Sequence, residues 1–552
     1  MKNIYKFFII FFLLNSFNIK SQILKNLSSS FQSNSAYYLD DSKTGDFNFD
    51  NRFRSNNYLN LKTYSDKNWN FELQIESYSP KALLNYSPNF EEVGISTFNV
   101  QYNKKKLNIQ LGNFYEQFGS GMILRSWEDK DLGINNSVRG MNAKYRINDK
   151  INITTIIGDQ KKGFKYSKGY IIGFDSEFDA SDILKSDSTF LLGLSYVGRN
   201  DNITKSESYK KMTNLFSGRI DYSSNSFYTN IELIHKTKDA IKIFGGLSNT
   251  FIKEGSALLY NAGIFKNGFG LDFTFRRLEN MSVYSKRVAF GNLYNESIIN
   301  YLPALTKQHD YSLTNLYVYA AQPNVSFQSK NLTKVGETGF QTDIYYFIKE
   351  DTFLGGEYGT NLAFNWSLWN NLDGEFDYFN QKYETDLFGF GKKYFSEISF
   401  EIRKKWSKKF DNILLFVNQF YNKKLIEETL GEIKSNILVL ESTYKINQNK
   451  SLRLELQHLT TEDDTKNWSA IGLEYNISSA VSIYISDLYN YQNPDIVEKI
   501  HYYNLGGSYS KGINRYTINY GRQRGGLVCT GGICRYVPES TGFNFTITTS
   551  FF

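Results

Sequence analysis

Apolar and polar residues alternate along much of the chain in segments of about ten residues, the length of a membrane-spanning β-strand. Clear examples are FELQIE at 71–76, FGLDFTFRR at 269–277, ISFEIR at 398–403, LRLELQ at 452–457 and YTINY at 516–520. A period of two indicates strands whose two faces meet different surroundings. A β-sandwich would alternate as well. Here the polar face carries full charges instead of Ser and Thr, which favours a membrane barrel.

The links between these segments alternate in length. Short polar links lie near 65–67, 103–105, 148–150, 223–224, 266–268, 407–409, 448–450, 476–478 and 510–512, and longer segments include 117–137, 279–335, 368–393, 420–436 and 522–540. Short turns at one rim and long loops at the other are typical of an outer-membrane β-barrel. The pattern predicts an all-β fold, a single antiparallel barrel of about 24 strands within a range of 18 to 24. The weakest predicted strands are 167–175 and 310–320.

The chain begins with the pattern of a secretory signal. Lys2 and Lys6 precede an apolar stretch at 7–14, and Ser21 offers a small residue before a cut at Gln22. The alternative is a short amphipathic anchor. We expect three regions: a signal peptide at 1–21; an N-terminal segment at 22–50 that is periplasmic, plug-like or a first strand; and the barrel at 51–552.

The chain ends in an amphipathic strand. Apolar Phe543, Phe545, Ile547 and Phe551 alternate with polar residues up to Phe552. This resembles the final strand that outer-membrane barrels present to the barrel-insertion machinery, which makes that machinery an expected partner. The alternative is a chance strand at the end of a soluble domain.

Composition supports a barrel and excludes other classes. There are 41 Tyr, 45 Phe and 6 Trp, although hydrophobic residues make up only 41%. No apolar run after residue 21 approaches the length of a membrane helix, and a disordered chain would have few aromatics. The formal net charge of +7 is too mild to argue for nucleic acid as a partner.

Cys529 and Cys534 are the two cysteines of the chain. A secreted chain enters an oxidising compartment, so a disulfide is expected between them. Two free thiols are the alternative. A metal site would need further Cys or His residues nearby.

No catalytic, cofactor or metal site can be assembled from the sequence, so we expect no enzyme. The four histidines, His235, His309, His458 and His501, are widely spaced. His235 and His458 alternate in step with the apolar, lipid-facing residues of their strands, which suggests residues at the membrane interface. The alternative is a Ser–His lipase, but no Ser and Asn partners for such a site can be named in the sequence. Gly119–Ser120–Gly121 lacks the spacing of a nucleophile elbow.

One loop and one face carry the candidate functional residues. The loop 117–137 contains mixed charges and could fold inward as a constriction or lie outside as a solvated loop. Its candidates are Arg125, Glu128, Asp129, Asp131 and Arg139. If it folds inward, Glu128 and Asp129 should lie near a lumen arginine such as Arg219, Arg276 or Arg453. The full set of candidate lumen residues is Glu72, Glu76, Arg219, Asp221, Asp272, Arg276, Glu401, Arg403, Glu441, Arg453, Glu455 and Arg515.

Three motifs carry a family resemblance. They are GNFYEQFGSGMILRSWEDKDLGINNSVRG at 112–140, SNSAYYLDDSKTGD with RFRSNNYLNL near the start, and CTGGICRYVPESTGFNFTITTSFF at the end. The chain resembles an uncharacterised family of Bacteroidota outer-membrane β-barrels. The resemblance implies the barrel fold and an outer-membrane location, and it transfers no catalytic residue.

Two functions fit a charged lumen. The first is a channel or transport-type barrel surrounded by outer-membrane lipid. The second is a non-transporting scaffold or accessory subunit of an envelope secretion or assembly complex, its lumen blocked by loop 279–335, loop 117–137 or segment 22–50. Whether the lumen is open separates the two.

Overall fold

The computed structural model describes residues 26–551, apart from a few short internal segments. Those segments are 66–67, 85, 88–89, 91, 185–186, 202–209, 244–245, 288–296, 328, 330–331, 430 and 531; in addition, the side chains of 241–251 and 530 are not described. The predicted signal peptide at 1–21 and the terminal Phe552 lie outside the described residues.

The long strands that form the wall of the molecule are β1 (Ser28–Leu39), β2 (Phe53–Ser65), β3 (Trp69–Ser77), β4 (Val93–Lys104), β5 (Leu107–Phe114), β10 (Val138–Arg146), β11 (Ile151–Lys162), β13 (Tyr170–Asp179), β14 (Thr189–Asn200), β15 (Met212–Ser223), β16 (Phe227–Ile243), β17 (Gly246–Lys266), β18 (Phe269–Glu279), β21 (Gly336–Ile348), β22 (Thr360–Asp377), β23 (Lys382–Lys405), β24 (Phe410–Tyr421), β25 (Ile433–Asn447), β26 (Lys450–Thr460), β27 (Trp468–Asn476), β28 (Val481–Tyr489), β29 (His501–Lys511), β30 (Asn514–Gln523) and β33 (Ser540–Phe551). Short elements of the connections are β6 (Gln117–Phe118), β7 (Leu124–Arg125), β8 (Glu128–Asp129), β9 (Ile134–Asn135), β12 (Lys165–Tyr166), η2 (Ser181–Leu184), η3 (Leu313–Asn315), β19 (Ser326–Phe327), β20 (Thr333–Lys334), α2 (Lys423–Ile426), β31 (Gly526–Thr530) and β32 (Ile533–Val537).

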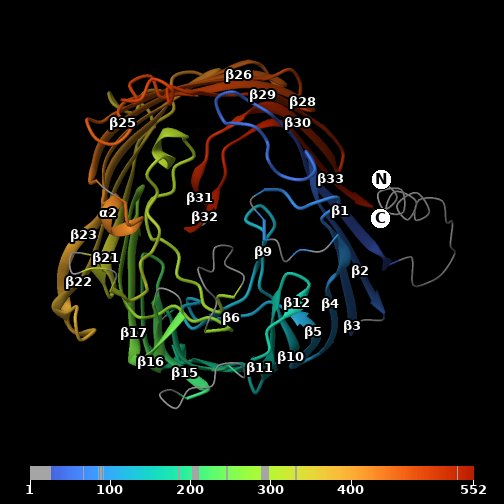
Figure 1. Cartoon of the computed structure of the whole chain (residues 1–552), viewed down its shortest axis with the longest axis vertical. Coiled ribbons are helices and arrows are strands. Elements are labelled where there is room, and N and C mark those ends of the chain that lie inside the picture. Colours follow the sequence, from blue (N-terminus) through green and yellow to red (C-terminus); the bar gives the residue numbers. More distant parts are fainter. Residues whose placement is uncertain are drawn as a thin grey trace.

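The wall closes into a ring because its first strand pairs with its last. β1 pairs antiparallel with β2 on one side and with β33 on the other, where Ser29 faces Phe551 and Leu39 faces Thr541. The two strands lie side by side at the seam of the ring (Figure 1). The described ring has 24 strands, with β12 attached to β11 as an extra short strand. The predicted fold and strand number are therefore confirmed, and residues 22–50 contain the first strand.

Alternating side chains along each strand face opposite sides of the wall. The outer side is apolar and exposed; examples are Leu194, Phe216, Leu233, Leu438, Ile485, Leu505 and Ile518. His235, which pairs with Phe216, lies on this outer face as expected. A closed barrel with an apolar outer band satisfies every strand amide and presents hydrocarbon to lipid. The protein is thus an outer-membrane β-barrel.

Within the described part of the chain, no helix is long and apolar enough to cross a membrane.

The predicted short links from 103–105 onward fall in tight turns at one rim, which in barrels of this type faces the periplasm. The link at 65–67 lies partly outside the described residues. The prediction of a long loop at 368–393 is wrong. There β22 and β23 continue as a paired hairpin as far as Asp377 and Lys382, with register shifts between Trp369 and Gly374. The extra ladder pairs satisfy backbone groups that a loop would leave to solvent. Of the two weakest predicted strands, the first overlaps β13, whereas 310–320 forms no strand and contains the short helix η3.

A disulfide joins Cys529 to Cys534 with an S–S distance of 1.98 Å, as predicted. The two cysteines face each other across the β31–β32 hairpin. The bridge therefore fixes the tip of this hairpin.

We expect thiol reagents to leave the native, non-reduced protein unlabelled and to label Cys529 and Cys534 after reduction. The barrel should stay folded in the reduced state, because the hairpin pairs with no wall strand. Mass spectrometry after labelling gives the first result and heat-modifiable gel migration the second. Labelling of both thiols without reductant would contradict the disulfide.

Candidate functional site

The loop between β5 and β10, residues 115–137, folds into the barrel; we call it inner loop 1. Ile123 and Leu124 are fully buried and belong to one apolar cluster with Val197 and Leu215, which point inward from β14 and β15. Gly119 makes the turn possible. Its φ is +54°, and a Cβ there would lie 2.6 Å from a carboxylate oxygen of Glu232. Of the two placements left open by the sequence, the structure has the inward one.

A second segment, residues 297–327, crosses the lumen and is hydrogen-bonded to inner loop 1; we call it inner loop 2. The amide of Arg125 donates to the carbonyl of Ile299 over 2.9 Å, and the amide of Tyr301 donates to the carbonyl of Gly121 over 2.9 Å. The side chain of Asn300 adds a hydrogen bond of 2.9 Å to another carbonyl of inner loop 1. Main-chain pairing therefore holds the two loops together.

The connection from β30 to β33, residues 524–539, forms a third inward segment that we call the inner hairpin. Its β31 and β32 lie within the ring in Figure 1. Arg535 donates to the carbonyl oxygens of Leu132 and Asp131 in inner loop 1, the latter over 2.7 Å. The amide of Ala304 in inner loop 2 donates to the carbonyl of Gly532 over 2.9 Å. The inner hairpin thus contacts both inner loops, and we call the three segments together the loop plug.

The acidic residues of inner loop 1 contact other groups than the predicted arginines. Glu128 accepts hydrogen bonds from the amides of Gln74 over 2.7 Å and Asn135 over 3.0 Å. Burial raises the pKa of the Glu128 carboxyl above its usual range. Asp129 accepts a hydrogen bond from the amide of Leu132 within its own loop. The predicted pairing of these two acids with lumen arginines is therefore wrong.

The arginines proposed as partners are paired with acids of the wall and of its strand ends. Arg219 contacts Asp175 at 2.9 Å, Arg276 contacts Glu337 at 2.5 Å, and Arg453 contacts Glu441 at 2.7 Å. In each pair the two residues come from different strands that the barrel brings together. Sequence reasoning missed Asp175 because it ends one of the two weakest predicted strands, and Glu337 because it adjoins the long segment 279–335.

The remaining candidates of the predicted constriction loop, Arg125, Asp131 and Arg139, have three different environments. The guanidinium of Arg125 lies 3.8 Å from the centre of the Tyr301 ring. The backbone of Asp131 binds the inner hairpin, as described above. Arg139, however, is in β10 on the same face as Met141, which is 41% exposed to lipid, and it stacks on Tyr166 at 3.5 Å. Arg139 is thus no constriction residue, because strand β10 begins one residue before it and fixes its direction outward.

The twelve candidate lumen residues all share the inward face of their strands. Some are deeply buried, for example Glu76, which accepts hydrogen bonds from Tyr78 and Ser96. Others are partly solvated, for example Glu72, which pairs with Lys62 at 2.9 Å. The remaining members of the set are Arg219, Asp221, Asp272, Arg276, Glu401, Arg403, Glu441, Arg453, Glu455 and Arg515.

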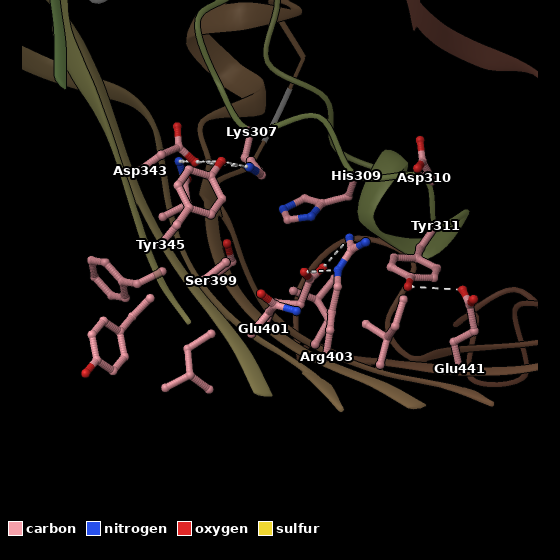
Figure 2. A pocket seen from close by; sticks show the side chains of 18 of the residues that line it. Lys307, His309, Asp310, Tyr311, Asp343, Tyr345, Ser399, Glu401, Arg403 and Glu441 are labelled. Carbon is pink, nitrogen blue, oxygen red and sulfur yellow. Dashed lines mark hydrogen bonds and ion pairs between the residues drawn. The ribbon is translucent and has the colours of Figure 1, made fainter. Parts of the chain in front are cut away.

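A polar cavity of about 640 Å³ lies between inner loop 2 and the wall strands β21–β26. Figure 2 shows side chains that line it, among them three of the predicted lumen residues, Glu401, Arg403 and Glu441. A fourth predicted lumen residue, Arg453, also lines the cavity. Gly268 of the short β17–β18 turn also lines it, so the cavity lies toward the periplasmic rim. We call it the lumen cavity.

Inner loop 2 supplies cavity residues that the sequence did not reveal. Lys307 contacts Asp343 at 3.1 Å and the Tyr345 hydroxyl at 2.8 Å. The Tyr311 hydroxyl donates to Glu441 over 3.2 Å. Burial raises the pKa of Tyr311, so its phenol stays protonated at neutral pH and acts as a donor. The length and aromatic content of segment 279–335 were the only sequence signals that pointed to this role.

His309 also enters the lumen and contacts Glu397 at 2.8 Å. No cluster of three or more His, Cys, Asp or Glu residues suited to a metal ion occurs among the described residues.

The chain belongs to DUF6029, a family of unknown function whose model matches residues 1–551. No curated protein matches it. Among solved structures, it is similar to the siderophore receptor PirA from Pseudomonas aeruginosa, at 7% identity and a TM-score of 0.40 over 96% of this chain and 80% of that one. It is also similar to OccK1 from the same organism, at 8% identity and a TM-score of 0.37 over 96% and 99%. A third is the copper transporter OprC, at 9% identity and a TM-score of 0.40 over 95% and 81%.

The buried Arg276–Glu337 pair yields a stability prediction. Glu337→Gln should leave the Arg276 guanidinium charged and buried without its counter-ion, lowering the free energy of unfolding by about 3 kcal/mol. The midpoint of urea unfolding, followed by heat-modifiable gel migration, measures the change.

Glu401→Gln is the matched control, because the Arg403 side chain that pairs with Glu401 is 58% exposed. We expect that change to stay below about 1 kcal/mol. Equal losses in the two variants would contradict the assignment of Arg276 and Glu337 as a buried pair.

Proposed function

We propose that this member of DUF6029 is a transport-type barrel for polar solutes, held closed by the loop plug. The observation that carries the proposal is the contrast between the two parts of the lumen. The loop plug fills one part with interlocked main chain and buried apolar side chains. The lumen cavity leaves a polar, charged space toward the periplasmic rim. A wall of paired charges suits a path for water and small polar solutes.

The contacts of the loop plug support a closed state that can open. Inner loop 1 and inner loop 2 meet through a few hydrogen bonds, each worth about 1 kcal/mol net, and through the packing of Ile123 and Leu124 in one apolar cluster with Ile299. The wall strands pair independently of those bonds, because each pairs with its neighbours in the ring. Rearrangement of the inner loops would therefore leave the barrel intact.

A scaffold or accessory role remains the second candidate, and one observation favours it. Two apolar clusters inside the ring combine wall residues with residues of the inner loops. Such packing would suit a permanently filled barrel that serves an envelope complex. Neither proposal assigns the chain a reaction. An origin in Bacteroidota, and insertion through the terminal strand by the barrel-insertion machinery, belong to both proposals.

Deleting residues 119–131 should raise the single-channel conductance in a planar bilayer, or open a barrel that is closed before the deletion. The deletion removes Ile123 and Leu124 from the apolar cluster and the groups that bind inner loop 2. Deleting residues 351–356, an exposed turn at the short-loop rim, is the control and should leave conductance unchanged.

An unchanged conductance after deletion of 119–131, in a barrel that still shows heat-modifiable migration, would favour the scaffold role. Cleavage at Arg125 or Lys130 by a protease added to intact cells would also contradict the proposal, because both residues belong to a loop that the proposal keeps inside.

A further inference from the structure

A basic hollow of about 530 Å³ lies on the wall at the short-loop rim, where β4, β5, β10 and β11 meet. Five cationic residues line it: Lys104, Lys105, Lys106, Lys144 and Arg146. No acidic residue occurs among the described residues that line it, whereas the lumen cavity is lined by both signs. Like charges gathered in a concave wall focus a positive potential. The basic hollow therefore attracts anions at the mouth of the barrel.

The inward face of β10 directs two of these cations into the lumen. Met141 and Tyr145 are 41% and 48% exposed on the outer face, so Lys144 and Arg146 point the other way. In the pairing register, Lys144 faces Asn108. The side-chain amide of Asn108 donates to Asn103, which also lines the basic hollow. The cations are therefore the donors that an oxygen anion would meet there.

The turn between β4 and β5 adds to the charge of the basic hollow in an unexpected way. Lys105 has a φ of +49°, a conformation that costs an L-residue about 1 kcal/mol and favours Gly or Asn. Lys104 and Lys106 flank it. The turn thus carries three consecutive cations. Gly or Asn would suit the backbone of position 105 better than Lys does, and the geometry of the turn does not require a charge there.

Lys144 connects the basic hollow to the loop plug. Its ammonium lies 2.7 Å from the carboxylate of Glu116, which is in inner loop 1. The Asn142 amide donates to the same carboxylate over 2.7 Å. Glu116 is therefore held to the wall by two side chains, Lys144 and Asn142. Of these two, only Lys144 also lines the basic hollow.

We propose that the basic hollow binds a small multivalent anion that carries phosphate or carboxylate groups, and that this anion competes with Glu116 for Lys144. Binding then removes one of the two anchors of Glu116 and weakens the attachment of inner loop 1 to the wall. The coupling is reciprocal, since Glu116 lowers the affinity for the anion as much as the anion weakens the anchor. Anion binding is independent of the proposed function. Only the expectation that a weaker attachment of inner loop 1 helps the pore to open rests on the proposed function.

The test is isothermal titration calorimetry of the full-length protein in detergent, with inorganic pyrophosphate as the probe. Lys105→Gly, Lys106→Gln and Arg146→Gln, combined in one variant, should weaken binding roughly tenfold or more, as expected for the loss of several charge-assisted contacts. Gly at position 105 suits the positive φ, so the turn should form in the variant. Heat-modifiable migration verifies that the barrel is folded.

Lys408→Gln, Lys409→Gln and Lys445→Gln form the matched control, because this variant changes net charge by the same amount at the same rim. Lys445 and Lys409 lie together there, joined by a backbone hydrogen bond of 2.7 Å, on a part of the wall away from the basic hollow. The control should bind pyrophosphate with wild-type affinity. Equal weakening in both variants, or no binding by the wild type, would overturn the anion site.

Glu116→Gln tests the competition separately. Removing the carboxylate frees Lys144, and pyrophosphate should then bind several-fold more tightly. Unchanged affinity would overturn the coupling to inner loop 1. None of these measurements uses conductance. If the barrel binds pyrophosphate but never conducts ions, the proposed pore is rejected and the anion site still stands.

Discussion

The need to pair every backbone amide of a strand inside lipid governs the rest of this structure. An unpaired amide in hydrocarbon costs several kcal/mol, so the sheet has to close. β1 and β33 close it over eleven consecutive residue pairs, from Ser29–Phe551 to Leu39–Thr541. Outside the ring, Arg522 and Thr541 both bind the carboxylate of Asp41 next to this seam. Once the ring is closed, the band of the wall that meets lipid disfavours charge, so most charged side chains of the strands face the interior.

That constraint explains why the interior combines ion pairs with an apolar core. Several charges that face inward are paired across strands, as Arg276 is with Glu337, and Glu337 also accepts a hydrogen bond of 2.6 Å from the Tyr319 hydroxyl of inner loop 2. The inner loops contribute apolar residues that pack on the wall and exclude water from these pairs. Excluding water strengthens each pair and also makes each one expensive to break. The interior therefore resembles the core of a soluble protein enclosed in a membrane-facing wall.

The sequence predicted the wall well and the loop plug poorly, for a physical reason. Strand faces follow from a local period of two, so Glu401, Arg403 and Arg453 could be assigned to the lumen from their immediate neighbours. Loop contacts depend on residues far apart in the chain, such as Lys307 with Asp343, and no local pattern encodes them. Arg139 was assigned to a loop because the start of β10 could not be located to one residue. The hairpin of β22 and β23 was taken for a loop because its register shifts interrupt the alternation.

The contacts of Arg535 have a consequence for the order in which the molecule forms. Arg535 and its acceptor Asp131 are 404 positions apart in the chain, and the inner hairpin that carries Arg535 directly precedes β33, the strand that completes the ring. The contact between the inner hairpin and inner loop 1 is thus made by a stretch of chain that leads directly into the strand that seals the wall. An assembly intermediate that lacks this stretch would have both an unpaired edge at β1 and an incompletely filled interior. Closing the wall and filling the lumen therefore depend on the same stretch of chain.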